Sequence, residues 1–201
     1  MKPIRLAVAA LTLSLVSLGA LAQGLPPVKV IGVITAVNGD EIDIKGDDGT
    51  VTQAFLGDKS LVFQTTTIAF SDIKPGQFVG TATRPGTDGK LSGIELHTFD
   101  ASMGRAGEGF FPWDDGSDSM MANGTLSKVV GTTDHTITVT YNGGEQTVDI
   151  PADTPVANMA PSDRTALVVG AHAIARGSKD AAGKYNVAFI TAGKDGNVPA
   201  V

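Results

Sequence analysis

The chain has 201 residues, no cysteine, 15 basic and 21 acidic residues, and a formal net charge of −6. The lack of cysteine excludes disulfides, thiolate metal sites and cysteine nucleophiles. Because an acidic protein repels phosphate groups, nucleic acids and anionic membrane surfaces are not expected partners.

Residues 1–22 have the pattern of a signal peptide. Lys2 and Arg5 precede an apolar run from Leu6 to Leu18, and Ala20-Leu21-Ala22 fits the small-x-small rule for cleavage. An uncleaved membrane anchor is the alternative, but the run is shorter than the roughly 20 residues that a spanning helix needs. Cleavage would remove two basic residues and no acidic ones, which leaves a net charge of −8. We expect an exported protein, periplasmic or alternatively secreted, with no membrane span in the mature chain.

Residues 28–98 are predicted to form a unit of five β-strands. Val28 to Val37 is rich in β-branched residues, and Asn38-Gly39 is a strong signal for a tight hairpin turn. A three-stranded meander is expected there. A short helical turn, capped by Ser71, then precedes two further strands.

Residues 123–192 repeat this order of elements. Gly170 and Gly183 follow Gly76 and Gly89 at one spacing of 94 residues, which favours an internal duplication over a chance resemblance of two meanders. The expected organisation is a signal peptide (1–22), a first barrel repeat (28–98), a connector (99–122), a second barrel repeat (123–192) and a flexible tail (193–201).

Each repeat fits a small closed barrel of the OB type, because closure of the five strands would remove exposed sheet edges. A two-layer sandwich is the alternative, which periodicity does not separate from a barrel. The predicted class is all-β, with two tandem five-stranded OB-like barrels that arise from an internal duplication and are joined by a long irregular connector.

Four motifs in the first repeat carry a family resemblance. They are a Gly-x-Ile-x-x-Val start, a Gly-Asp turn, a strand that ends in Asp-Gly and an Asp-Leu-Lys-x-Gly-like segment, found at Gly32–Val37, Gly39-Asp40, Asp48-Gly49 and Asp72–Gly76. The chain thereby resembles an uncharacterised family of exported bacterial proteins with tandem OB-like repeats, a domain of unknown function. The second repeat departs from the pattern, since Gly131–Asp134 replaces the Gly-Asp turn and Arg164–Gly170 lacks the Lys-x-Gly step.

The connector is similar to that of two-repeat family members. The matching segments are Met103-Gly104-Arg105, Gly107-Glu108-Gly109, Pro112-Trp113-Asp114 and Met121–Thr125. Relatives carry a histidine where this chain has Phe110, which weakens a metal site implied by the resemblance. Some members are labelled automatically as metal-transporter proteins, but a chain without membrane helices beyond the signal is not a permease. The resemblance covers nearly the whole mature chain and implies no settled activity.

The aromatic residues of the connector are the first candidates for a ligand or partner site. Phe110, Phe111 and Trp113 would form an apolar patch if exposed. Arg105 and Glu108 are three residues apart and are expected to pair in the glycine-rich turn beside them. The alternative is that the aromatics are buried and fix the connector against the barrels.

A metal site is the second candidate in the same region. His97, Asp100, Met103 and Glu108 offer imidazole, thioether and carboxylate ligands, which would suit copper or Ca²⁺. Their spacing matches no EF-hand or methionine array, so a solvated acidic linker is the alternative.

The chain has no Gly-x-Ser-x-Gly elbow, P-loop, His-Glu-x-x-His or Rossmann fingerprint. We therefore predict a non-catalytic binding or interaction module for a protein or small-molecule ligand, and no enzyme. A periplasmic metal-binding accessory protein that uses the connector is the alternative, and a hydrolase without recognisable motifs is a third hypothesis.

Overall fold

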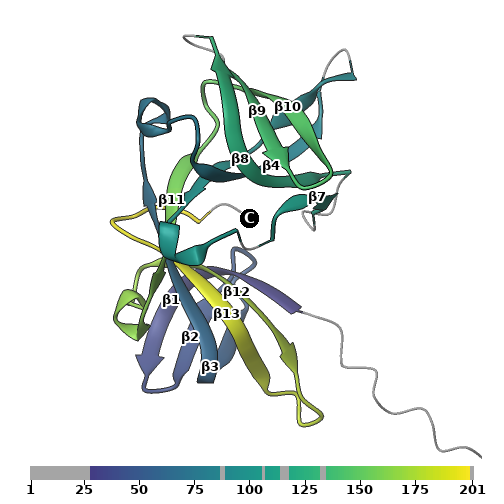
Figure 1. Ribbon diagram of the computed structural model, residues 1–201. Coiled ribbons are helices and arrows are strands. Elements are labelled where there is room, and N and C mark those ends of the chain that lie inside the picture. Colours follow the sequence, from purple (N-terminus) through teal and green to yellow (C-terminus); the bar gives the residue numbers. More distant parts are fainter. Residues whose placement is uncertain (1–27, 87–88, 106, 114–117, 132–134, 200–201) are drawn as a thin grey trace, which may run out of the picture.

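The computed structural model describes residues 28–86, 89–105, 107–113, 118–131 and 135–199 (Figure 1). It is an all-β structure, as predicted, with only short 3-10 helices between the strands. The predicted signal peptide, residues 1–22, lies outside the described residues. Within the described ranges, none of the helices has the length and apolar character needed to cross a bilayer.

The first barrel is a closed ring of five strands, drawn in the lower half of Figure 1. Its strands in ring order are β1 (Val28–Asn38), β2 (Glu41–Lys45), β3 (Val51–Thr67), β13 (Tyr185–Gly193) and β12 (His172–Lys179). The β1–β2–β3 meander follows its turn signals, and Gly39 supplies a positive φ of 62° in the first turn. The ring closes because β13 pairs with β3 in parallel and β12 pairs with β1 in antiparallel orientation.

The second barrel has the same strand order and lies above the first in Figure 1. Its ring consists of β8 (Met120–Val130), β9 (His135–Tyr141), β10 (Gly144–Ile150), β5 (Leu91–Gly93) and β4 (Phe78–Pro85). Here β5 runs parallel to β10 over two residue pairs, and β4 pairs antiparallel with β8. The closed rings decide between barrel and sandwich in favour of the barrel.

The division into residues 28–98 and 123–192 is wrong as an assignment of strands to barrels. Each barrel takes its three-stranded meander from one half of the chain and its last two strands from the other half. The physical reason is the length of β3, which runs for 17 residues from Val51 to Thr67 and carries the chain out of the first barrel. The halves therefore exchange their fourth and fifth strands.

Two further strands join the barrels at the waist of the molecule. β11 (Val156–Ser162) lies between β6 (Leu96–Phe99), to which it is parallel, and the end of β3, to which it is antiparallel. In the described part of the chain, 3-10 helices lie between strands at η1 (Phe70–Asp72), η3 (Ala101–Met103) and η4 (Arg164–Ala166). One continuous network of strand pairing thus runs through both barrels.

The spacing of 94 residues reappears in the strand registers. Tyr185 pairs with Ala54 in the first barrel, and Leu91 pairs with Val148, the equivalent position, in the second. The antiparallel β3–β11 pairing is centred on Thr65 and Met159, which are themselves 94 residues apart. The halves are thus related by an approximate two-fold axis through this pair. This relation supports the predicted duplication, which stays a prediction.

Each barrel encloses its own hydrophobic core. The first core includes Ile34, Ile44 and Tyr185, and the second is built around Leu126 and Ile137. These side chains alternate along their strands with more exposed residues, as expected for strands with one buried face. The cavity described below lies outside both cores.

Three local expectations need correction. The connector is not irregular, since it contains η3 and β7 (Gly109–Pro112), and β7 pairs with β8. Ser71 lies inside η1, whose cap is Ala69. The tail is held in place as far as residue 199, because the Asn197 side chain is hydrogen-bonded to Thr65 at 2.6 Å and to Thr67 at 2.7 Å.

Candidate binding cavity

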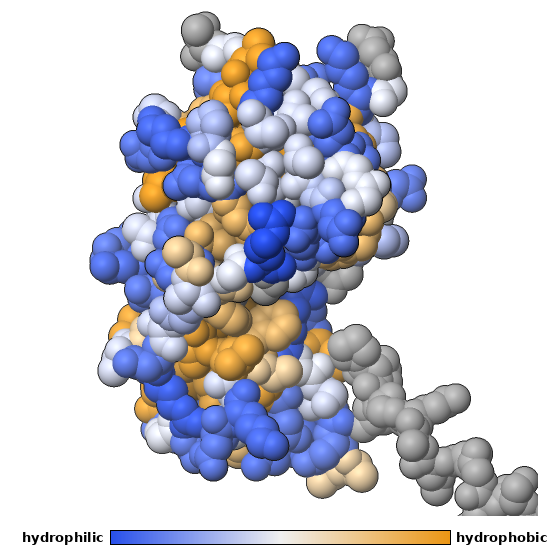
Figure 2. All heavy atoms as spheres, viewed as in Figure 1, coloured by the Kyte–Doolittle hydropathy of each residue, from blue (hydrophilic) through white to orange (hydrophobic). Residues whose placement is uncertain are grey.

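A cavity of about 170 Å³ lies between the two barrels. The residues around it come from both halves of the chain and are mostly apolar. They are Phe63, Glu95, His97, Phe99, Trp113, Met121, Asn123, Met159, Ile174, Arg176, Phe189 and Thr191. Figure 2 shows apolar side chains gathered on the lower barrel beside the waist between the barrels. The waist therefore combines a hollow with an apolar lining.

Three adjacent strands, β4 and β8 of the upper barrel and β6 beside β4, form the polar wall of the cavity. Gly80 of β4 pairs on one side with His97 of β6 and on the other side with Asn123 of β8. Paired residues of antiparallel strands project from the same face of a sheet, so both polar side chains flank the position where Gly80 has none. A Cβ atom at Gly80 would overlap Asn123 Oδ1 and lie 2.9 Å from the Phe99 ring. Glycine thus makes room for the asparagine amide.

His97 is buried, with 4% of its surface exposed, and its Nε2 atom has no hydrogen-bond partner. Its Nδ1 atom lies 3.7 Å from Oε1 of Glu95, which is also buried. Burial lowers the pKa of His97 to about 4, so the imidazole is neutral at neutral pH and this contact is not an ion pair there. His97 therefore presents an unused neutral nitrogen inside the molecule.

Asn123 leaves a second buried polar atom without a partner. Its Nδ2 atom donates a 3.0 Å hydrogen bond to the carbonyl of Gly107, whereas Oδ1 has no donor. The bond to Gly107 fixes the orientation of the amide. Buried polar groups are nearly always satisfied in native proteins, so two unsatisfied atoms on residues that line one cavity require an explanation.

Trp113 is the one aromatic residue of the predicted site that lines the cavity. It follows β7, and its backbone N–H and C=O are both hydrogen-bonded to Ser119. The guanidinium of Arg176 from β12 lies 5.0 Å from the centre of the indole ring. Asp114, which ends the Pro112-Trp113-Asp114 segment of the family resemblance, lies outside the described residues.

The other residues of the predicted aromatic site fix the connector instead. Phe110 stacks on Tyr141 at 6.4 Å, and Phe111 is half-buried in β7. Arg105 and Glu108 pair as expected, at 2.6 and 2.7 Å. Hydrogen bonds to the Arg105 guanidinium lower the pKa of Glu108 and raise that of Arg105.

The pair also reaches the second barrel. Arg105 bonds to the Thr125 hydroxyl at 2.9 Å and lies over the Phe78 ring, while Glu108 accepts a 2.9 Å bond from the Asn142 backbone. These contacts attach the glycine-rich turn to β4, β8 and the β9–β10 turn. Neither residue lines the cavity.

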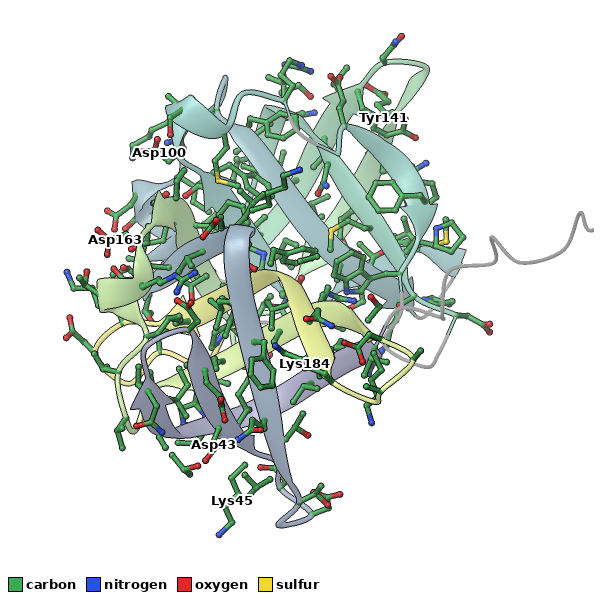
Figure 3. The ribbon with its side chains drawn as sticks, turned by 90° about the horizontal axis from the view of Figure 1, so that it is seen from below. Asp43, Lys45, Asp100, Tyr141, Asp163 and Lys184 are labelled. Carbon is green, nitrogen blue, oxygen red and sulfur yellow. The ribbon has the colours of Figure 1, made fainter. Side chains whose placement is uncertain are left out.

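The predicted metal ligands are not brought together. Asp100 and Tyr141 lie at opposite sides of the molecule in Figure 3, and Glu108 bonds to the residue next to Tyr141. Asp100 instead caps η3 by accepting from the Ser102 backbone at 2.9 Å, which contributes to its lowered pKa. Across the described ranges, no three His, Asp or Glu side chains are grouped as metal ligands. Copper or Ca²⁺ binding at this set stays a prediction without geometric support.

Several cavity residues were not singled out from the sequence. Glu95 and Asn123 belong to the polar wall, and Phe63, Arg176 and Phe189 come from strands of the first barrel. The one local signal is Gly80, since a glycine inside a strand often marks a close approach of other groups. The remaining positions depend on the exchange of strands between the halves.

No protein-family model, curated protein or solved structure matches this chain.

Proposed function

We propose that the protein is a non-catalytic binding protein that holds a small, largely apolar molecule in the cavity between its barrels. One observation carries the proposal. Two buried polar atoms without partners, His97 Nε2 and Asn123 Oδ1, belong to residues that line an otherwise mostly apolar cavity. Cavities with a few convergent polar groups are the usual form of small-molecule sites.

The volume of the cavity suits an occupant of about one ring. An engineered apolar cavity of about 150 Å³ in another protein admits benzene, and this cavity measures about 170 Å³. Phe63, Phe99 and Phe189 provide aromatic contacts for such a molecule.

Binding fits the site better than catalysis does. A general base works best when its pKa lies near the working pH, and burial lowers the pKa of His97 to about 4. A neutral imidazole of this kind is a weak base but a good hydrogen-bond partner. The sequence pattern of residues 1–22 supports a periplasmic or secreted location for this activity.

Ligand titration tests the proposal directly, because Trp113 lines the cavity and is the only tryptophan. We expect toluene or phenol to change its fluorescence in a saturable way and to raise the melting temperature. A ligand at a hundred times its Kd stabilises a protein by about 2.7 kcal/mol. 1-Naphthol, which is too large for a one-ring cavity, serves as the control ligand. If toluene and phenol both leave fluorescence and stability unchanged at millimolar concentration, the proposal is wrong.

A further inference from the structure

The approximate two-fold axis that relates the halves passes through the region of the cavity. Positions 94 residues apart occupy equivalent places in the barrels, and two such pairs line the cavity with both members: Glu95 with Phe189, and His97 with Thr191. Met159, at the centre of the symmetric β3–β11 pairing, lines it as well. The cavity is therefore formed by equivalent faces of the two barrels.

The two faces differ in chemistry. The upper barrel contributes Glu95, His97 and Asn123, whereas the equivalent face of the lower barrel contributes Phe189, Thr191 and Ile174. Ile174 stands at the position equivalent to Gly80, so the lower wall has an apolar side chain where the upper wall has the Asn123 amide packed over a glycine. The two walls therefore differ at equivalent positions, although the lower one also carries Arg176.

Of the two unpartnered atoms, Asn123 Oδ1 is a hydrogen-bond acceptor, and His97 Nε2 is one in the tautomer that carries its proton on Nδ1. Asn123 Oδ1 can only accept, and the bond from Nδ2 to the Gly107 carbonyl prevents the amide from turning over. A carboxylate 3.7 Å from Nδ1 favours the His97 tautomer with its proton on that nitrogen, which leaves a lone pair on Nε2. Unused acceptors call for a donor on the ligand.

The charges around the cavity favour a neutral ligand. Glu95 and Arg176, one acidic and one basic residue, both line it. No single sign of ligand charge suits both residues, and a charged ligand must lose its hydration to enter a mostly apolar cavity. A neutral molecule does not lose the hydration of a charge.

We propose that the ligand is a neutral, single-ring-sized molecule with one O–H or N–H donor, bound with the donor toward His97 and Asn123 and its apolar part toward Phe63, Phe189 and Ile174. The inference rests on the proposed function and specifies its ligand class. Phenol and aniline are the simplest members of this class.

Calorimetric titration of the mature chain with four compounds of similar size tests the inference. Phenol has the donor, anisole carries the same oxygen without a donor, toluene has neither, and benzylammonium carries a charge. We expect phenol to bind at least tenfold more tightly than each of the others. Equal affinity for phenol, anisole and toluene would overturn the inference and leave the proposed function intact. No binding of any compound would overturn both.

The variant Asn123→Leu removes the acceptor at similar volume. We expect the preference for phenol over toluene to fall to less than threefold, with binding of toluene retained. Asn158→Leu on β11 is the matched control, because Asn158 accepts a hydrogen bond from Thr98 and does not line the cavity. An unchanged preference in Asn123→Leu would contradict the assigned contact.

A measurement on the wild type covers the case in which Asn123→Leu does not fold. The ¹⁵N chemical shift of His97 Nε2 reports directly on hydrogen bonding at that atom. We expect saturating phenol to move the shift toward the value of a hydrogen-bonded nitrogen, and toluene to leave it in place. If both compounds bind and neither moves the shift, the donor is not directed at His97.

Discussion

Gly80 determines the shape of the polar wall by the side chain that it lacks. It lies on β4 between His97 and Asn123, where any Cβ would overlap the asparagine amide. Its backbone pairs normally on both sides, so the requirement for glycine comes from space and not from a positive φ. A single methyl group at this position would disturb the site without touching either barrel core.

We therefore expect Gly80→Ala to weaken phenol binding strongly and to lower the free energy of unfolding by about 1–3 kcal/mol, the usual cost of overpacking. Calorimetry and urea unfolding measure the two effects. Gly57→Ala on β3 is the control, because a Cβ there meets no atom within 4 Å. Equal behaviour of the two alanine variants would show that the Gly80 position does not shape the cavity.

His97 should make the protein sensitive to mild acid. Burial lowers its folded pKa to about 4, below the ordinary 6.5 of the unfolded chain. The unfolded state therefore takes up the proton first, so stability is fully present above about pH 6.5 and falls as the pH drops to 4. A difference of about 2.5 pKa units corresponds to a loss of roughly 3 kcal/mol in the free energy of unfolding once the pH is below the folded pKa.

Urea unfolding between about pH 7 and pH 4.5 measures this effect. We expect His97→Gln to lose less stability than the wild type over that range. Exposed carboxylates with lowered pKa values, such as Asp48 and Asp163, are common to both proteins and cancel in the comparison. Parallel pH profiles for the two proteins would contradict a buried neutral His97.

At the scale of the elements, the chain after β13 acts as a clamp on β3. Lys194 donates its backbone N–H to the Thr65 carbonyl at 2.8 Å, and Asn197 bonds to the hydroxyls of Thr65 and Thr67. Thr65 is fully buried at the centre of the β3–β11 pairing. The clamp thus satisfies a polar group at the junction of the barrels.

Asn197→Ala should lower the free energy of unfolding by about 1–3 kcal/mol, because it leaves the buried Thr65 hydroxyl without a partner. Thermal and urea unfolding measure the loss. Val198→Ala, next along the chain and 58% exposed, is expected to be nearly neutral. If the two substitutions cost the same, the side-chain bonds of Asn197 do not stabilise the junction.

Elements defined by local signals were predictable, and their partners were not. The hairpin signal at Asn38-Gly39 leads to the predicted β1–β2 pair. An exchanged arrangement keeps the same alternation of buried and exposed residues, so the sequence pattern does not distinguish it from two separate barrels. His97 and Trp113 could be selected for their chemistry, but Asn123 gains its role only through the pairing of β4 with β8.

At the scale of the whole molecule, the exchange makes the two barrels depend on each other. Neither half of the chain contains a complete ring, because β12 and β13 complete the first barrel and β4 and β5 complete the second. The cavity lies between faces that this exchange holds together. We therefore expect the described part of the chain to unfold in one cooperative transition.

A chain cut between Asp114 and Asp115 tests this dependence. We expect the two fragments to remain together as a one-to-one complex after the cut, and to refold only when both are present. Size-exclusion chromatography and circular dichroism report on the two properties, with the intact chain as reference. Fragments that separate and stay folded would support two independent barrels and contradict the observed pairing.

The parallel pairing of β3 with β13 also determines the order in which the two barrels can be completed during synthesis. The second barrel has all its strands once Ile150 has been made, but the first barrel needs Gly193. Synthesis proceeds at about 5–20 residues per second. The time between the synthesis of Thr67, which ends β3, and of Gly193, which ends β13, is therefore roughly 6–25 s. The strands made first are thus completed last, and during that interval their unpaired edges can associate with other chains.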